Sequence, residues 1–406
     1  MKIFKLMAIA LVAMLGFTAC DKDCEHDFIE HDFSKDLVGT WSYFADNGQA
    51  EAMVIKEDGS FAITGIMQGG YLYEEKGTIK VVNNKVTLAY NSGDVFEGRL
   101  ELVAGKSMSI VMFDDNDVRL TYDYCANDLS DEIIGMWVCN DGVAGMSIQT
   151  YKEDGKCIYT GFSLGANDYM TNYESTYEVF GDMMFQKTGD RYFATRCTYI
   201  PNGNSLGDIL STTSTILVNG EYVTSSYSFL RVKQDLNLAG KVYDYISAYV
   251  TNVKGKDEDF SIVGNTFNIA KMNASNFDMM FRSVLSCLEF PNATTIKQHF
   301  LTNGVESGFD TPITVEGNKV TLDMSAGNPA YRKVEMYMFQ DADDSQLHIY
   351  MPTASFINYF ANLELVTLLV DGKIDLNDAT AVAKVFADME ARIESVNVSF
   401  VYKARK

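Results

Sequence analysis

The chain has 406 residues, of which 47% are hydrophobic and 22% charged, and this composition argues against a disordered, collagenous or polytopic membrane chain. Its 33 basic and 55 acidic residues give a formal net charge of −22, so a nucleic acid would be repelled and we expect no nucleic-acid partner. The length alone predicts about two to four domains.

Residues 1–19 have the features of a lipoprotein signal peptide. Lys2 and Lys5 precede an apolar stretch, residues 6–17, that is too short for a typical membrane-spanning helix. The segment ends in Phe17-Thr18-Ala19-Cys20, which resembles a bacterial lipobox with Phe in place of the usual Leu. The resemblance implies cleavage before Cys20 and its conversion into a diacylglyceryl cysteine that anchors the protein in a membrane. The alternative is an ordinary signal peptide followed by an incidental cysteine.

Residues 20–36 are predicted to form an acidic tether. Seven acidic residues and two lysines between Asp21 and Asp36 favour a solvated, unfolded segment. The early acidic residues also resemble the export signal of Bacteroidota-type surface lipoproteins, which implies the outer face of the outer membrane. His26 and His31 lie in a repeated Glu-His-Asp-Phe motif and are candidate ligands for Zn²⁺ or Ni²⁺. Their five-residue spacing is poor for a helix, so a plain tether is the preferred interpretation.

Residues 37–124 and 132–233 are predicted to be two copies of one module. Leu37-Val38-Gly39-Thr40-Trp41 is echoed by Ile133-Ile134-Gly135-Met136-Trp137, an offset of 96 residues. Lys56-Glu57-Asp58-Gly59 recurs as Lys152-Glu153-Asp154-Gly155 at the same offset. One register across two motifs indicates a duplication. Within each module, short strands alternate with turn signals, which predicts an antiparallel meander that closes into a small barrel.

A third, divergent module is predicted over residues 238–406. The segment 313–322 matches 79–88 and has the pattern of a β-hairpin. Residues 275–304 and 355–370 are partly helical in pattern, and 376–394 has apolar residues at helical spacing. A final strand over 396–402 would close the sheet.

Gly39 to Trp41 and Gly135 to Trp137, each opening a β meander, resemble the Gly-X-Trp signature of the lipocalin, or calycin, family. In that family an Arg on the closing strand packs across the Trp, so the resemblance implies cation–π contacts of Arg119 with Trp41 and of Arg231 with Trp137. It implies a mainly β fold of tandem antiparallel lipocalin-like barrels, the third module being α+β with added helices. The modules are shorter than a usual lipocalin, so narrow barrels filled by their own side chains are the alternative to barrels with a ligand cavity.

No catalytic site and no cofactor are predicted. Outside the tether the chain has only His299 and His348, and the first two modules contain no His, which argues against a Ser-His-Asp triad there. The acid-rich stretches 114–117 and 341–344 lie between strands, where turns favour Asp and Asn. Residues 371–378 resemble half of a calcium-binding loop, but a helix N-cap at Asp375 or Asn377 explains them more simply.

Export permits disulfides, although no framework spacing is present. Cys157 and Cys197 lie in strands of the second module and are candidates for pairing across the sheet. Free buried thiols are the preferred alternative.

We therefore expect a lipid-anchored outer-membrane protein, exposed at the cell surface, that binds a small molecule, a glycan or a protein noncovalently. An interaction protein with solid barrels, structural or inhibitory in role, is the alternative. A carboxylate-dependent hydrolase within residues 238–406 is less favoured.

Overall fold

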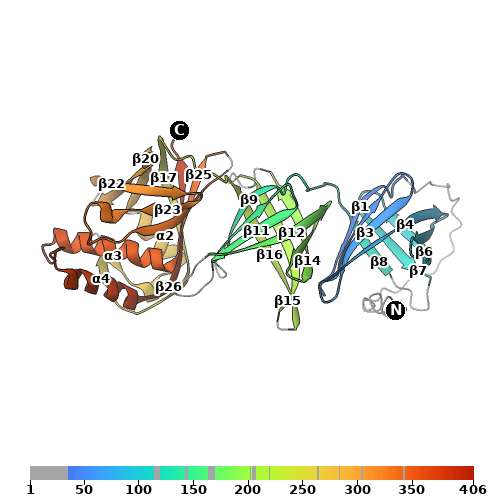
Figure 1. The fold of residues 1–406 in the computed structure, drawn as a ribbon, viewed down its shortest axis with the longest axis horizontal. Helices are drawn as coiled ribbons and strands as arrows, with labels where there is room; N and C mark the ends of the chain where they lie inside the picture. Colours follow the sequence, from blue (N-terminus) through green and yellow to red (C-terminus); the bar gives the residue numbers. More distant parts are fainter. Residues whose placement is uncertain are drawn as a thin grey trace.

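The computed structural model describes residues 35–406 except 114–118, 142–144, 163–169, 202, 204–206, 219, 263–264, 283, 303–304 and 342. The predicted signal peptide, Cys20 and the two histidines of the predicted tether, His26 and His31, lie outside the described residues. Three closed antiparallel barrels of eight strands each follow one another along the chain, and they lie in a row (Figure 1). Helices occur in the third barrel of the described chain, so the predicted fold class, mainly β with a helical C-terminal module, is confirmed.

Barrel 1 is an up-and-down meander in which each strand pairs with the next and β8 closes on β1. Its strands are β1 (Gly39–Phe44), β2 (Ala50–Ile55), β3 (Ser60–Met67), β4 (Tyr71–Val82), β5 (Lys85–Tyr90), β6 (Val95–Val103), β7 (Ser107–Met112) and β8 (Arg119–Tyr124). Alternate side chains of a strand point to opposite faces. The inward set includes Trp41, Met53, Ile63 and Ile110, which form the barrel core.

Barrel 2 repeats this topology, with β16 closing on β9. Its strands are β9 (Gly135–Asp141), β10 (Gly145–Tyr151), β11 (Lys156–Phe162), β12 (Met170–Phe180), β13 (Met183–Thr188), β14 (Arg191–Ile200), β15 (Ile209–Val218) and β16 (Glu221–Val232). Strands β1 and β9 begin at Gly39 and Gly135, and β3 and β11 begin at Ser60 and Lys156, so both pairs keep the offset of 96 residues seen in the sequence. The predicted duplication is therefore visible strand by strand.

Barrel 3 has the same number of strands but a longer and more varied connection between its first two. Its strands are β17 (Lys241–Gly255), β20 (Leu285–Asn292), β21 (Thr295–Thr302), β22 (Val305–Glu316), β23 (Lys319–Leu322), β24 (Val334–Gln340), β25 (Gln346–Met351) and β26 (Ile393–Ala404). The hairpin β18 (Phe260–Ile262) and β19 (Asn265–Phe267), the 3-10 turn η2 (Ile269–Lys271) and helix α2 (Ala274–Arg282) separate β17 from β20. A second 3-10 turn, η3 (Met324–Ala326), follows β23.

Helices α3 (Thr353–Val370) and α4 (Ala379–Arg392) connect β25 to β26 and cover one end of barrel 3 (Figure 1). Phenylalanines from α2, α3 and β26 meet there, with Phe356 stacked on Phe360 at 4.0 Å between ring centroids. Helix α3 is long and apolar enough to cross a membrane by length and composition, but half of it is buried in this core. An all-round apolar helix suits such a buried place.

The N-cap of helix α4 lies one residue after the later of its two predicted positions. The carboxylate of Asp378 accepts hydrogen bonds from the backbone N–H groups of Thr380 and Ala381 at 3.0 and 3.1 Å. Asp375 instead accepts from the backbone N–H of Asn377 at 2.9 Å and shapes the preceding turn. The N-cap is therefore Asp378, not Asp375 or Asn377.

Apolar contacts join neighbouring barrels. Ala50 and Ile66 on the outer wall of barrel 1 belong to one buried cluster with Met183 and Phe185 of barrel 2. A second cluster combines Ile148 and Val232 of barrel 2 with Phe339 and Tyr350 of barrel 3. These outward side chains are the reason that several strands are apolar on both faces.

Candidate binding sites

The two signature tryptophans occupy equivalent surroundings. Both are fully buried, and each indole Nε1 donates to the backbone carbonyl four residues before it, Trp41 to Leu37 at 2.8 Å and Trp137 to Ile133 at 2.7 Å. The glycines of the motif, Gly39 and Gly135, have φ values of +138° and +133°, a conformation that side chains disfavour. The motif therefore builds one closed end of each barrel.

Arg231 lies across Trp137, as the lipocalin resemblance implies. It pairs with Trp137 between strands β16 and β9, and its guanidinium carbon is 4.7 Å from the centroid of the indole ring. The guanidinium also donates to the backbone carbonyl of Glu132 and lies 3.7 Å from the carboxylate of Asp208. Arg231 thus ties the N-terminal segment of barrel 2 to its closing strand.

Arg119 does not take the equivalent place in barrel 1. Its side chain is half exposed and forms an ion pair with Glu101 at 2.7 Å. The residue of β8 that pairs with Trp41 is Tyr124, whose ring meets the indole edge-on with 5.0 Å between centroids. The expected contact of Arg119 with Trp41 is wrong because Arg119 lies five residues before the point where β8 meets Trp41.

The opposite end of barrel 1 contains a carboxylate surrounded by tyrosines. Glu51, on β2, accepts hydrogen bonds from the hydroxyl of Tyr73 and, at 2.6 Å, from that of Tyr122. Burial and the negative charge of Glu51 raise the pKa values of Tyr43, Tyr73, Tyr90 and Tyr122, so all four hydroxyls stay protonated at neutral pH. In the described chain no lysine or arginine forms an ion pair with Glu51. This end of the barrel therefore favours cationic or hydrogen-bond-donating groups over anions.

Gly65 makes this arrangement possible. It lies between Glu51 on β2 and Tyr73 on β4 in the cross-strand register. A Cβ atom at Gly65 would lie only 2.4 Å from the ring of Tyr73. The absence of a side chain lets the tyrosine ring lie over the strand and reach Glu51.

Barrel 2 has a neutral interior at the same level. Ser147 stands where barrel 1 has Glu51, and it pairs with Cys139 where Glu51 pairs with Tyr43. Buried polar side chains face inward beside the apolar core, among them Ser175, Gln186, Thr195 and Thr212. The two copies have therefore kept the closed end and diverged in the interior.

The core of barrel 3 is built from apolar and aromatic side chains. A cavity of only about 20 Å³ lies at its helical end, lined by apolar or aromatic residues that include Phe267, Phe281, Phe300 and Phe360. Such a volume holds about one water molecule, and an apolar lining offers it no partners. Barrel 3 thus offers no room for a ligand at this cavity.

A much larger hollow lies between barrels 2 and 3. This inter-barrel cleft has a volume of about 520 Å³ and is open to solvent. It is lined by Met136, Ile148, Thr150, Ile158, Thr160, Tyr173 and Glu174 of barrel 2 and by Glu316, Asn318, Lys319 and Tyr337 of barrel 3. Pockets of about 300–1,000 Å³ with a few convergent polar groups are the usual sites for small ligands.

Neighbouring contacts fix the polar side of the cleft. Asn318, in the turn between β22 and β23, donates to the backbone carbonyl of Met338 at 3.0 Å. Lys319 forms an ion pair with Glu335 at 2.8 Å. On the barrel 2 side, the ring of Tyr173 stacks on that of Tyr159 with 4.8 Å between centroids, and both rings share the inward face of Cys157 and Ser175, so they point into barrel 2 and not into the cleft.

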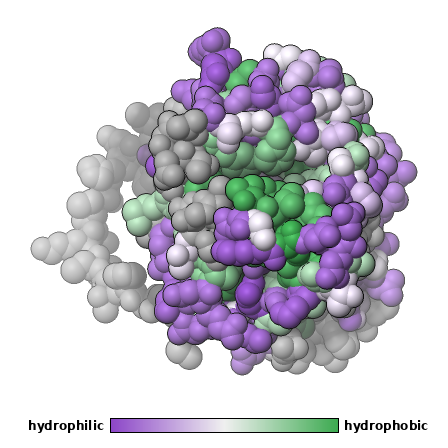
Figure 2. All heavy atoms as spheres, turned by 90° about the vertical axis from the view of Figure 1, so that its left-hand side faces the viewer, coloured by the Kyte–Doolittle hydropathy of each residue, from purple (hydrophilic) through white to green (hydrophobic). Residues whose placement is uncertain are grey.

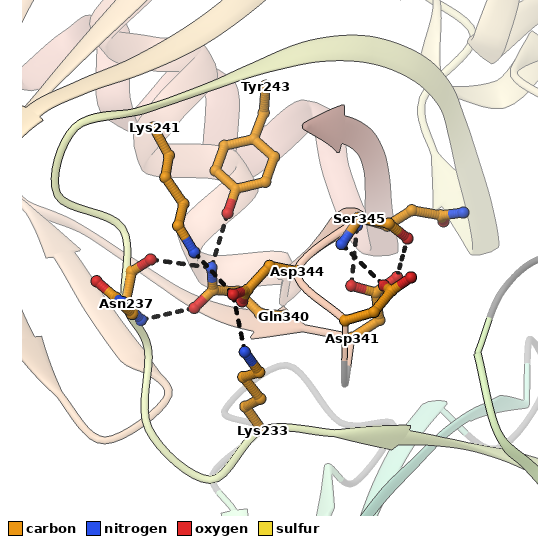
Figure 3. Close-up of polar contacts among 10 residues, drawn as sticks. Lys233, Asn237, Lys241, Tyr243, Gln340, Asp341, Asp344 and Ser345 are labelled. Carbon is orange, nitrogen blue, oxygen red and sulfur yellow. Dashed lines mark hydrogen bonds and ion pairs between the residues drawn. The ribbon is translucent and has the colours of Figure 1, made fainter. Parts of the chain in front are cut away.

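A buried glutamine, Gln340, anchors the linker between barrels 2 and 3, residues 233–240 (Figure 3). The side-chain amide of Gln340 donates to the hydroxyl of Tyr243 at 2.7 Å and to the carbonyl of Asn237 at 3.0 Å. Its carbonyl oxygen accepts from the backbone N–H of Asn237 at 2.6 Å. The amide group is thus satisfied on both ends, and the linker is held against barrel 3.

An ion-pair cluster adds to this joint (Figure 3). The carboxylate of Asp344 lies 2.8 Å from the ammonium group of Lys233 and 3.1 Å from that of Lys241. Burial opposes ionisation of Asp344, but the two ammonium groups hold its pKa below the usual value. Backbone pairing of Val232 with Asp341 continues the last strand of barrel 2 onto barrel 3. The position of the barrels on either side of the cleft is therefore fixed by specific bonds.

The acid-rich stretches and the two cysteines singled out in the sequence remain to be placed. Asp341 accepts from the hydroxyl of Ser345 at 2.6 Å and from the N–H of Gln346 at 2.9 Å, and Asp343 accepts from the N–H of Ser345 at 2.9 Å, so these acidic residues shape the connection to β25. The stretch 114–117 lies outside the described residues. Cys157 and Cys197 form no disulfide and are buried in the core of barrel 2.

No protein-family model matches the chain, and no curated protein matches its sequence. Among solved structures, it is similar to a porin-like protein from Bacteroides uniformis ATCC 8492, with 9% sequence identity, a TM-score of 0.14, and coverage of 47% of this chain and 92% of that chain. The assignment of the chain as a tandem β-barrel protein rests on its own three barrels.

Proposed function

We propose that the protein is a lipid-anchored protein of the outer cell surface that binds a small hydroxyl-rich ligand, of the glycan class, in the inter-barrel cleft. The observation that supports this most is the cleft itself, about 520 Å³ in volume and lined by both aromatic and polar side chains. The proposal includes no catalytic step.

The lining suits a sugar better than a lipid. Tyr337, which lies between the core residues Met336 and Met338 and so faces outward, lines the cleft with its ring and hydroxyl, and sugars have an apolar face that packs on such rings. Thr150, Thr160 and Asn318 add neutral groups that both donate and accept hydrogen bonds. An aliphatic chain has no group that can exchange hydrogen bonds with this lining, whereas the hydroxyls of a sugar can both donate and accept.

The location rests on the sequence, through the signal peptide, Cys20 and the acidic tether. Labelled palmitate should be incorporated into the native chain and not into Cys20→Ala. A processed native protein that takes up no lipid would contradict the anchor.

A second candidate function is binding of a protein partner at the helical end. Figure 2 views the molecule from the barrel 3 side and shows hydrophobic residues gathered within a hydrophilic surround. Exposed apolar side chains on the helices of barrel 3 include Met279, Leu369 and Val370. Contiguous apolar surface of this kind is typical of interaction sites.

Titration of the unlipidated chain with a panel of oligosaccharides tests the first function. We expect saturable binding that weakens at least tenfold in Tyr337→Ala. Tyr249→Ala is the matched control, because Tyr249 is 53% exposed and does not line the cleft. Equal affinity in Tyr337→Ala and Tyr249→Ala, or no binding to any oligosaccharide, would contradict the proposal.

A further inference from the structure

Three potential metal ligands meet on the outer wall of barrel 3. Cys287, His299 and Glu306 each offer a ligand atom, and these atoms lie within 4.8 Å of one another. They come from the adjacent strands β20, β21 and β22, and Cys287 is directly opposite His299 in the register. Their chain neighbours Leu288 and Phe300 belong to the barrel core, so the alternation of the strands turns Cys287 and His299 outward.

The imidazole of His299 is held in a defined orientation. Its Nδ1 atom is 3.1 Å from the carboxylate of Glu306, and its Nε2 atom is 3.2 Å from the carboxylate of Glu289. Histidines that bind metals commonly use one nitrogen for the ion and donate the other N–H to a carboxylate. Glu289 is placed to accept that second bond.

A glycine leaves space beside the imidazole. Gly308 is opposite His299 on β22, and a Cβ atom there would lie 3.4 Å from Nδ1 and 3.2 Å from the carbonyl of Gln298. The side of the ring that faces Glu306 is therefore not crowded by a side chain from β22 at this position.

The three groups form a gradient from buried to exposed. Cys287 is 4% exposed, the side chain of His299 is 16% exposed, and that of Glu306 is 51% exposed. An ion can therefore enter from solvent at Glu306 and meet the thiol at the base. Arg405 also lies near Cys287, but its guanidinium is paired with the carboxylate of Asp244.

We propose that Cys287, His299 and Glu306 bind one Zn²⁺ ion, with Glu289 as the positioning residue for His299. Sulfur, nitrogen and oxygen donors together suit zinc, whereas calcium and magnesium take oxygen ligands. Binding forms a zinc–thiolate bond and releases the thiol proton of Cys287 to solvent. Three protein ligands leave a fourth position for water.

This site goes beyond the proposed function, since none of its residues lines the inter-barrel cleft. Failure of either proposal leaves the other intact.

Cobalt titration of the unlipidated chain carrying His26→Ala and His31→Ala tests the site without the tether histidines. We expect one equivalent of Co²⁺ to bind with a thiolate-to-cobalt charge-transfer band, and Zn²⁺ to displace it. Cys287→Ser should abolish the band, and His299→Gln and Glu306→Gln should weaken zinc binding at least tenfold. Glu289→Gln should weaken it about 10- to 100-fold. Cys157→Ser, which removes a buried thiol of barrel 2, is the control and should bind as the parent does.

Thermal unfolding of each metal-free variant separates loss of a ligand from loss of the fold. A charge-transfer band that persists in Cys287→Ser would overturn the proposal. So would unchanged zinc affinity in a folded His299→Gln or Glu306→Gln variant, or the loss of all binding when only the tether histidines are replaced.

Discussion

At the scale of single residues, Tyr124 and Arg231 fill the same place by different chemistry. Each lies opposite the signature tryptophan of its barrel on the closing strand. Tyr124 meets Trp41 edge to face, and Arg231 lies over Trp137 as a cation. The duplicated modules therefore preserve the covered tryptophan while the covering residue varies.

Replacing Arg231 and Arg119 with alanine distinguishes a buried contact from a surface ion pair. Arg231→Ala should lower the free energy of unfolding by about 1–2 kcal/mol, because it removes the cation–π contact and the packing of the aliphatic stem. Arg119→Ala should cost less than about 1 kcal/mol, since exposed ion pairs contribute little. Urea denaturation of both variants measures the difference, and equal losses would contradict the assignment.

His348 is predicted to make stability depend on pH. Burial lowers the pKa of His348 to about 4, and its Nε2 atom has no hydrogen-bond partner in the described structure. In the unfolded chain the imidazole binds a proton near pH 6.5, so the unfolded state holds more protons between about pH 6.5 and 4. Stability should therefore fall as the pH is lowered through this window, by up to about 3 kcal/mol from this group.

The variant His348→Gln isolates this contribution. Its free energy of unfolding, measured from pH 7.5 to pH 4, should decline less steeply than that of the native chain. Parallel curves for the two proteins would show that His348 is not the group responsible.

At the scale of elements, contacts within one strand or turn could be predicted from the sequence, whereas contacts that depend on the pairing register between strands could not. The barrels could be predicted from local signals: the motifs at Trp41 and Trp137, the turn residues, and the two-residue period of the short strands. Arg119 is misplaced because the residue that meets Trp41 depends on the stagger of the closed sheet, which no local pattern reveals. The zinc ligands Cys287, His299 and Glu306 share no motif, since three different strands bring them together.

Gly65 on β3 lies between Glu51 on β2 and Tyr73 on β4, and its lack of a side chain lets Tyr73 join the tyrosines that surround Glu51. Gly65→Val should displace the ring of Tyr73, break its hydrogen bond to Glu51 and cost about 1–3 kcal/mol through overpacking. Gly327→Ala is the control, because Gly327 has a φ of −82° and no atom lies within 4 Å of the position that a Cβ atom would occupy there. Thermal denaturation compares them, and equal stability of both variants would contradict the packing described for Gly65.

At the scale of the whole molecule, the proposed ligand site belongs to no single barrel. The inter-barrel cleft exists because Gln340, Asp344 and the pairing of Val232 with Asp341 fix barrel 2 against barrel 3. The sequence predicts the barrels on each side but not this joint, since its partners lie about a hundred residues apart. The cavity at the helical end of barrel 3 holds only about 20 Å³, so the proposed ligand is placed in the cleft and not there.

Amide hydrogen exchange of the unlipidated chain, with and without a bound oligosaccharide, measures where the ligand sits. The account predicts slower exchange in β10, β11 and the turn between β22 and β23, with the closed end of barrel 1 at Trp41 unchanged. Slower exchange confined to the interior of one barrel, with none at the cleft, would contradict it.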